Sequence, residues 1–299
     1  MESVGVYNFM RNRKFESYLG NVFSPILDQT QKHKPNREVE KLTRTDFYVE
    51  DDGWFSILIS LARVVTCFLS MMVTTAVWSI IMVFLLPWPN QRIRQGNIYG
   101  HVTGRMLIWI LGNSVKIEGF ENSDKKAIFI CNHASPIDIF LIMWLTPVGT
   151  VGIAKKEIIW YPLFGQLYVL ANHLRIDRSN PTAAIQSMKE VAKSVVENNL
   201  SIIIFPEGTR SKNGKLLPFK KGFVHLALQT KLPIVPIVFT GTHLAWRKGS
   251  LRVRPAPITV KFLKPVETGN WKEKMIEEHV KEVHQIYVDN LPESQKPLV

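Results

Sequence analysis

The sequence contains a run of 23 residues without a charged side chain, from Val64 to Leu86. Extended back to Phe55, the same stretch carries one charge, at Arg63. About 20 predominantly apolar residues are enough for a helix to cross the hydrocarbon core of a bilayer. The run therefore predicts a membrane-anchoring helix rather than a buried helix of a small soluble domain. A hairpin that pivots near Arg63 and leaves by the face it entered is an alternative to a full crossing.

The segments on either side of this run set the domain boundaries. Residues 1–52 are polar and charge-rich with little periodicity, so we expect a mobile leader. A leader of this length also distinguishes the run from a cleaved signal peptide, whose apolar region follows a short basic start. Pro87 and Pro89 should end the apolar helix. We assign residues 53–90 to the membrane anchor and residues 91–299 to a globular domain.

Charge and cysteine content narrow the classes of partner. The net charge of +12 suits a polyanionic partner such as nucleic acid, anionic lipid or a phosphorylated substrate. A nucleic-acid binder would explain the charge but not the anchor, and no basic-aromatic stripe is present. We therefore expect a bilayer and no nucleic acid. Cys67 and Cys131 suggest no disulfide framework, and the histidines show no ligand spacing that predicts a metal site.

Beyond residue 91, short β-rich runs alternate with helical stretches. The expected strands are residues 115–118, 127–131, 200–205, 234–240 and 258–263, and the expected helices are residues 137–145, 181–197, 220–230 and 271–289. This alternation predicts an α/β fold in which helices cover both faces of a sheet. Two further apolar stretches, residues 137–151 and 158–172, are short for a bilayer crossing and are assigned to the globular domain.

The segment after the second expected strand carries a histidine and an aspartate five residues apart, His133 and Asp138. Ser135 is a good helix N-cap and Pro136 suits the first helical position, which puts Asp138 in the first turn, close to free backbone amides. His133 then follows the carboxyl end of a strand, where α/β proteins commonly place catalytic groups. An aspartate that accepts one ring N–H leaves the other nitrogen as a general base. In isolation, the same spacing also fits a polar loop residue beside a helix cap.

A second polar segment, Phe205-Pro-Glu-Gly-Thr-Arg-Ser211, also follows an expected strand. Gly208 permits close approach of the backbone, Thr209 supplies a hydroxyl, and Arg210 supplies a planar guanidinium suited to phosphate. This combination predicts a phosphate-binding loop that shares one pocket with His133. The alternative is a turn in which Glu207 and Arg210 pair with each other.

Taken together, four blocks in this order resemble the glycerolipid acyltransferase superfamily. The blocks are Asn132-His133-x4-Asp138, Ile176-Asp-Arg178, Phe205-Pro-Glu-Gly-Thr-Arg210 and Leu232-Pro-Ile-Val-Pro236. Among its branches, residues 55–299 are most similar to the lysophosphatidate acyltransferase family of the plant microsomal type. The resemblance implies that family's fold, a mixed α/β sheet covered by helices behind an N-terminal membrane-anchoring segment.

The resemblance also implies a role for each matching residue. His133 would act as the base on the sn-2 hydroxyl of lysophosphatidate, which then attacks the thioester of acyl-CoA, and Asp138 would orient the imidazole. Arg178 would help to hold the acceptor phosphate. Residues Glu207–Arg210 would shape the acceptor site, and residues 232–236 would line the acyl or donor region. Acyl-CoA would be a co-substrate, with no cofactor and no metal.

Several expectations about context follow from the same resemblance. The protein would be integral to the endoplasmic reticulum membrane, with its catalytic domain facing the cytosol, and would serve phospholipid and triacylglycerol biosynthesis. Cys131 lies close to His133, but its place at the end of a strand favours a core residue over a nucleophile. Two other readings remain open: an acyltransferase for glycerol 3-phosphate or another lysophospholipid, and a non-catalytic lipid-binding membrane module.

Overall fold

The structure is a computed structural model that describes residues 53–161, 164–177 and 181–297. The predicted leader, residues 1–52, and Arg178 lie outside the described residues. The described residues belong to a single compact unit, so the anchor segment and the globular domain are not separated by a linker.

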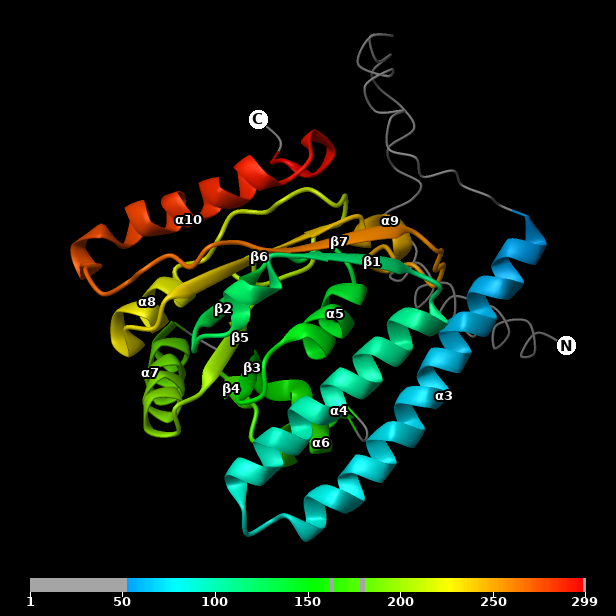
Figure 1. The fold of residues 1–299 in the computed structure, drawn as a ribbon, viewed down its shortest axis with the longest axis horizontal. Helices are drawn as coiled ribbons and strands as arrows, with labels where there is room; N and C mark the ends of the chain where they lie inside the picture. The colour runs from blue at the N-terminus through cyan, green and yellow to red at the C-terminus, as the bar shows by residue number, and fades with distance from the viewer. Residues whose placement is uncertain (1–52, 162–163, 178–180, 298–299) are drawn as a thin grey trace, which may run out of the picture. The chain divides into compact units, whose positions relative to one another are not determined.

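A seven-stranded sheet with the order β1-β7-β6-β2-β5-β3-β4 forms the centre of this unit (Figure 1). The strands are β1 (Ser114–Glu118), β2 (Ile128–Cys131), β3 (Thr150–Lys155), β4 (Leu174–Ile176), β5 (Ser201–Ile204), β6 (Ile234–Thr240) and β7 (Pro257–Phe262). Neighbouring strands are parallel except β6 and β7, which are antiparallel. The predicted mixed α/β sheet is confirmed, although β3 and β4 were not among the expected strands.

Helices cover both faces of the sheet and create a hydrophobic core on each. One face carries α4 (Pro89–Ile110), α5 (Ile137–Leu145), α6 (Phe164–Leu170) and α9 (Thr242–Ala245), and the other carries α7 (Pro181–Glu197), α8 (Gly222–Thr230) and α10 (Ile276–Asn290). Short 3-10 helices span Phe120–Ser123, Lys156–Trp160, Glu273–Met275 and Glu293–Gln295. Strand β2 contributes to both cores, because its successive side chains point to opposite faces of the sheet. Ile128 and Ile130 belong to the core with α8, and Phe129 and Cys131 belong to the core with α5.

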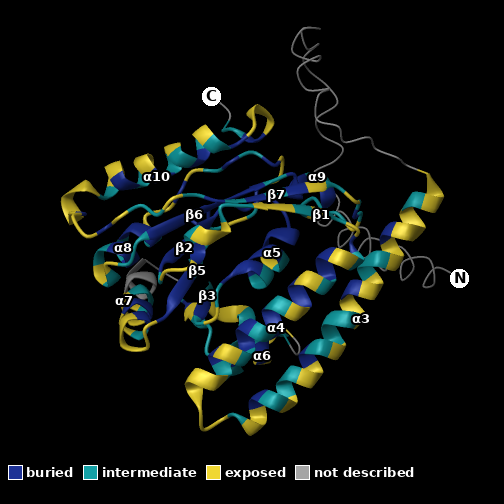
Figure 2. Ribbon diagram, in the orientation of Figure 1, coloured by how far each residue is buried: buried dark blue, intermediate teal, exposed yellow. Residues whose placement is uncertain are grey.

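Helix α3 (Trp54–Phe84) contains the uncharged run. Its buried residues, Ser60, Cys67, Thr75 and Met82, recur every seven or eight positions and form one narrow stripe that faces the domain. The large apolar side chains elsewhere on α3 are mostly exposed (Figure 2). Within the described ranges, α3 is the one helix long and apolar enough to cross a membrane. It is therefore a candidate membrane anchor.

Helix α4 was not predicted from the sequence, and it spans the boundary placed at residues 90 and 91. The prolines do end α3, but Pro89 then occupies the first turn of α4, where a missing N–H costs little. Helix α4 runs back along α3 and packs closely on α5 (Figure 1). Gly100 and Gly104 make this approach feasible, because a Cβ at Gly100 would lie 2.9 Å from the Met143 carbonyl oxygen and one at Gly104 would clash with that of Phe140.

Candidate active site

The loop that carries His133 is attached to two neighbouring strands. The Asn132 amide donates to the Phe239 carbonyl at 2.9 Å and accepts from the Phe239 N–H at 2.7 Å, which ties the loop to β6. The N–H of Ser211 donates to the His133 carbonyl at 2.8 Å. Because β2 and β5 are parallel neighbours, the loops that follow them emerge at the same edge of the sheet. The backbone of His133 is thus held from both sides.

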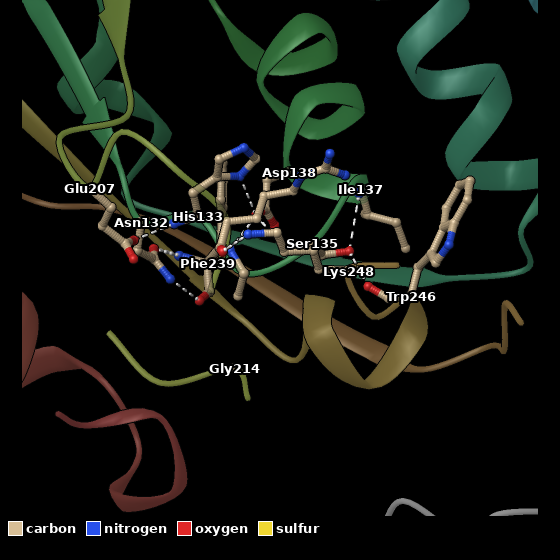
Figure 3. Close-up of polar contacts among 12 residues, drawn as sticks. Asn132, His133, Ser135, Ile137, Asp138, Glu207, Gly214, Phe239, Trp246 and Lys248 are labelled. Carbon is tan, nitrogen blue, oxygen red and sulfur yellow. Dashed lines mark hydrogen bonds and ion pairs between the residues drawn. The ribbon is translucent and has the colours of Figure 1, made fainter. Parts of the chain in front are cut away.

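His133 Nδ1 lies 2.9 Å from Asp138 Oδ2, as the spacing in the sequence predicted (Figure 3). The same oxygen accepts the N–H groups of Ala134 at 2.7 Å and Ser135 at 2.8 Å. Helix α5 begins at Ile137, so Pro136 is its N-cap rather than its first helical residue, and the Ile137 N–H donates to Ser135 Oγ at 3.1 Å. Since an ionised carboxylate can only accept, Nδ1 is assigned the proton and Nε2 keeps the lone pair that a general base needs.

The imidazole also has a packing partner at the end of β5. The Phe205 ring stacks on the His133 ring with 4.1 Å between centroids and 24° between planes. His133 is 9% exposed, and Asp138 is fully buried. A ring held by one hydrogen bond and one stacking contact has little rotational freedom, so Nε2 is presented in a defined direction.

Glu207 is placed differently from the expectation, because its side chain does not line the cavity and does not pair with Arg210. It is buried beneath the loop, where Oε1 accepts the His133 N–H at 2.6 Å and Oε2 accepts the Leu217 N–H at 3.1 Å (Figure 3). Glu207 is therefore a positioning residue for the backbone of His133. Burial raises the pKa of its carboxyl to about 8, while the two backbone hydrogen bonds act in the opposite direction.

The raised pKa of Glu207 predicts a pH-dependent stability. At pH values between 4.5, the ordinary pKa of the unfolded chain, and about 8, the pKa in the folded chain, the unfolded chain has released this proton while the folded chain retains it. The free energy of unfolding therefore falls as the pH rises through this range. Thermal unfolding should show that the melting temperature of the wild type exceeds that of Glu207→Gln by less as the pH rises. Each kcal/mol of lost stability lowers the melting temperature by about 2–4 °C. Equal pH slopes for the two proteins would show that Glu207 keeps its ordinary pKa.

A cavity of about 560 Å³ opens beside His133. At its polar end it is lined by His133, Gly208, Thr209, Arg210 and Lys248. The rest of the lining is mainly apolar, chiefly from α5, α6 and the segment before α6, with Ile139, Ile142, Met143, Ile158, Phe164, Leu167 and Ala171. It also includes polar residues, among them Asn97, Thr150, Lys155, Tyr168 and His173. The imidazole and the guanidinium thus share one pocket, as predicted. Its polar end suits an anionic group, and its apolar part suits a hydrocarbon chain.

Gly208 has a positive φ of 71°, a backbone conformation that other residues rarely adopt, so the loop favours glycine here. The Arg210 guanidinium makes no hydrogen bond or ion pair with any described residue, although its backbone carbonyl accepts from Lys248. The Arg210 guanidinium therefore lines the cavity with N–H donors that no described residue occupies.

One more sequence expectation is corrected by the geometry. Residues 232–236 do not line the cavity, because 232–233 precede β6 and 234–236 are the first residues of that strand, where they pair with residues 128–130 of β2 inside the sheet. His173 Nδ1 accepts the Gly152 N–H at 2.9 Å, and Asp177 pairs with Lys156 at 2.7 Å.

Two further groups bear on the chemistry. Cys131 is fully buried, and burial raises the pKa of its thiol well above the ordinary value, which disfavours the thiolate that a nucleophile needs. Lys248, which lines the cavity, was missed because it lies in a segment outside the four sequence blocks. In the described part of the chain, no group of three or more histidine, cysteine, aspartate or glutamate side chains could hold a metal ion.

Comparison with known proteins places this geometry in a family. A family model described as Acyltransferase matches residues 114–240. A 1-acyl-sn-glycerol-3-phosphate acyltransferase from Cocos nucifera is 64% identical over 299 residues, covering 100% of this chain and 96% of the relative. One from Escherichia coli is 33% identical over 203 residues, covering 66% of this chain and 80% of the relative.

The fold has a counterpart among solved structures. The crystal structure of the 1-acyl-sn-glycerophosphate acyltransferase from Thermotoga maritima superposes with a TM-score of 0.63 at 24% identity, covering 77% of this chain and 96% of that one. At this identity the likeness supports the fold, and the full-length match to the coconut protein supports the family. The chain therefore belongs to the 1-acyl-sn-glycerol-3-phosphate acyltransferase family.

Proposed function

We propose that this chain transfers an acyl group from acyl-CoA to the sn-2 hydroxyl of lysophosphatidate and so forms phosphatidate. The observation that carries the proposal is the shared cavity, in which the His133–Asp138 pair and Arg210 sit at the polar end of an otherwise mainly apolar space. This arrangement fits an acceptor with a hydroxyl, a phosphate and a hydrocarbon tail. The names of the relatives specify the same acceptor.

The chemistry requires one base and no covalent enzyme intermediate. His133 Nε2 takes the proton of the sn-2 hydroxyl as the oxygen attacks the thioester carbonyl, and a tetrahedral intermediate forms. Its collapse breaks the carbon–sulfur bond, and the departing sulfur of CoA receives the proton from the imidazolium. Asp138 stabilises the imidazolium while it exists, because its carboxylate accepts from Nδ1. The new ester and free CoA account for all the atoms.

The apolar part of the cavity is close to the candidate anchor. Leu167 and Ala171 line the cavity and also pack in a cluster with Met82 of α3. A lipid acceptor could therefore remain near the bilayer during the reaction. This arrangement supports a membrane-bound enzyme, and use of acyl-CoA argues for a catalytic domain on the cytosolic side of the endoplasmic reticulum. Its product would feed phospholipid and triacylglycerol synthesis.

An acceptor and donor comparison tests the proposed function. Purified wild-type protein should acylate lysophosphatidate from acyl-CoA with a kcat/KM at least about tenfold above that for glycerol 3-phosphate or lysophosphatidylcholine, because only lysophosphatidate offers both a phosphomonoester and a tail. A preference for glycerol 3-phosphate would reassign the acceptor. Activity only with a carrier-protein thioester would reassign the donor, and no transfer to any acceptor would favour a lipid-binding module.

Arg210 is expected to hold the acceptor phosphate. Arg210→Gln should raise the KM for lysophosphatidate about 10- to 100-fold, the usual size of a lost charge-assisted hydrogen bond, with a smaller change in kcat. Steady-state kinetics with each substrate varied in turn measure this. Lys212→Gln is the matched control, because Lys212 is exposed, carries the same charge and does not line the cavity. Equal KM values for the two variants would remove Arg210 from the site.

A further inference from the structure

A turn that follows α9 brings one more cation to the cavity. The turn is closed by a backbone hydrogen bond of 2.9 Å from Arg254 N–H to the Ala245 carbonyl and by a bridge between Trp246 and Val253. Gly249, with a φ of 81°, allows the chain to reverse. Lys248 precedes this glycine, and its side chain lines the cavity that contains His133.

The turn is attached both to the catalytic loop and to the candidate anchor. Ser135 Oγ donates to the Trp246 carbonyl at 2.7 Å, and the Trp246 indole N–H donates to the Ser250 carbonyl at 2.8 Å. On its other side, the Val253 N–H donates to Ser60 Oγ of α3 at 2.8 Å. Because Ser135 Oγ also accepts the Ile137 N–H at the start of α5, the base of the turn has a defined position relative to the His133–Asp138 pair (Figure 3).

The Lys248 ammonium group bonds only to neutral partners. Its Nζ donates to the Arg210 carbonyl at 2.8 Å and to Thr209 Oγ1 at 3.1 Å. Across residues 53–161, 164–177 and 181–297, no carboxylate lies within ion-pair distance of it. An ammonium group has three donors, so one remains for a ligand. A half-buried cation without a counterion is best stabilised by an anion that enters the cavity.

We propose that Lys248 is a second binding residue for the acceptor phosphate, acting beside Arg210. The inference rests on the proposed function, because it presumes a phosphorylated acceptor. The two cations come from different segments, Arg210 from the loop after β5 and Lys248 from the turn after α9. Together with Lys155, which also lines the cavity, they supply positive charge for the nearly two negative charges of a phosphomonoester at neutral pH. The contacts to Thr209 and Arg210 hold the ammonium group in the phosphate-binding loop before substrate arrives, which lowers the cost of ordering it.

Kinetics of three variants test this assignment. Lys248→Gln should raise the KM for lysophosphatidate about 10- to 100-fold while the KM for acyl-CoA changes less than about threefold. Lys248→Arg keeps a donor and the charge, and should recover most of the affinity. Lys212→Gln should match the wild type. The inference is wrong if Lys248→Gln resembles Lys212→Gln, or if it lowers kcat alone with both KM values unchanged, as loss of a purely structural link would do.

A measurement on the wild type avoids any folding defect of the variants. Lysophosphatidate should protect Lys248 from an amine-reactive acylating reagent, as read by mass spectrometry of the labelled peptide, whereas lysophosphatidylcholine should not. Equal labelling with either lipid would overturn the inference. A wild type that does not acylate lysophosphatidate contradicts the proposed function. An active wild type in which Lys248 is not protected contradicts only the assignment of Lys248.

Discussion

Replacing His133 with alanine is expected to lower kcat for acyl transfer by about 10²- to 10⁴-fold, the usual contribution of a general base. His133 is the imidazole at the polar end of the cavity whose Nδ1 is committed to a carboxylate, which leaves Nε2 for the hydroxyl proton. Without it, the sn-2 hydroxyl must attack the thioester while still protonated. Turnover at saturating acyl-CoA and lysophosphatidate measures the loss directly.

His225→Ala is a suitable control for this variant. His225 lies on α8, which covers the opposite face of the sheet from α5, and it does not line the cavity. Its removal should leave kcat unchanged within a factor of about three, inside the range of ordinary surface effects. If His133→Ala retains more than a tenth of wild-type turnover while folding normally, the base is another group. A protein without any catalytic role would show no difference between the two histidine variants.

The parts of the site that could be predicted from sequence are those determined by local chain geometry. His133 and Asp138 are five residues apart across a strand end and a helix start, and Ser135 between them is a helix-capping residue. These local preferences are sufficient to bring the imidazole to the carboxylate at 2.9 Å. The uncharged run up to Leu86 likewise predicted α3, because the length and polarity of a segment are properties of the segment itself.

The parts that could not be predicted depend on partners far away in the chain. Glu207 is turned beneath the loop by the N–H of His133, which is 74 residues away, and no local pattern distinguishes this orientation from one facing the cavity. Helix α4 contains glycines that disfavour an isolated helix, yet they are what its close packing on α5 requires. Lys248 reaches the site through a turn whose position depends on Ser135. In each case tertiary contacts override the local signal.

Asp138→Asn should lower kcat by about 10³- to 10⁴-fold, as loss of the aspartate does in other histidine-dependent transfers. The substitution is nearly isosteric, and the asparagine oxygen can still accept the N–H groups of Ala134 and Ser135, so the loop should stay folded. A neutral amide cannot stabilise the imidazolium as a carboxylate does. If the amide nitrogen turns toward His133 instead, the ring must adopt the wrong tautomer. Thermal unfolding and kcat, measured beside Asp124→Asn as an exposed control, separate stability from catalysis.

A double variant then decides whether the two residues act as one unit. If Asp138 works only through the imidazole, then His133→Ala combined with Asp138→Asn should be no slower than His133→Ala alone, because a carboxylate has nothing to orient once the ring is gone. Independent roles would instead multiply the two losses. A multiplied loss, or an Asp138→Asn enzyme within tenfold of the wild type, would rule out the His–Asp mechanism even if His133 itself proved essential.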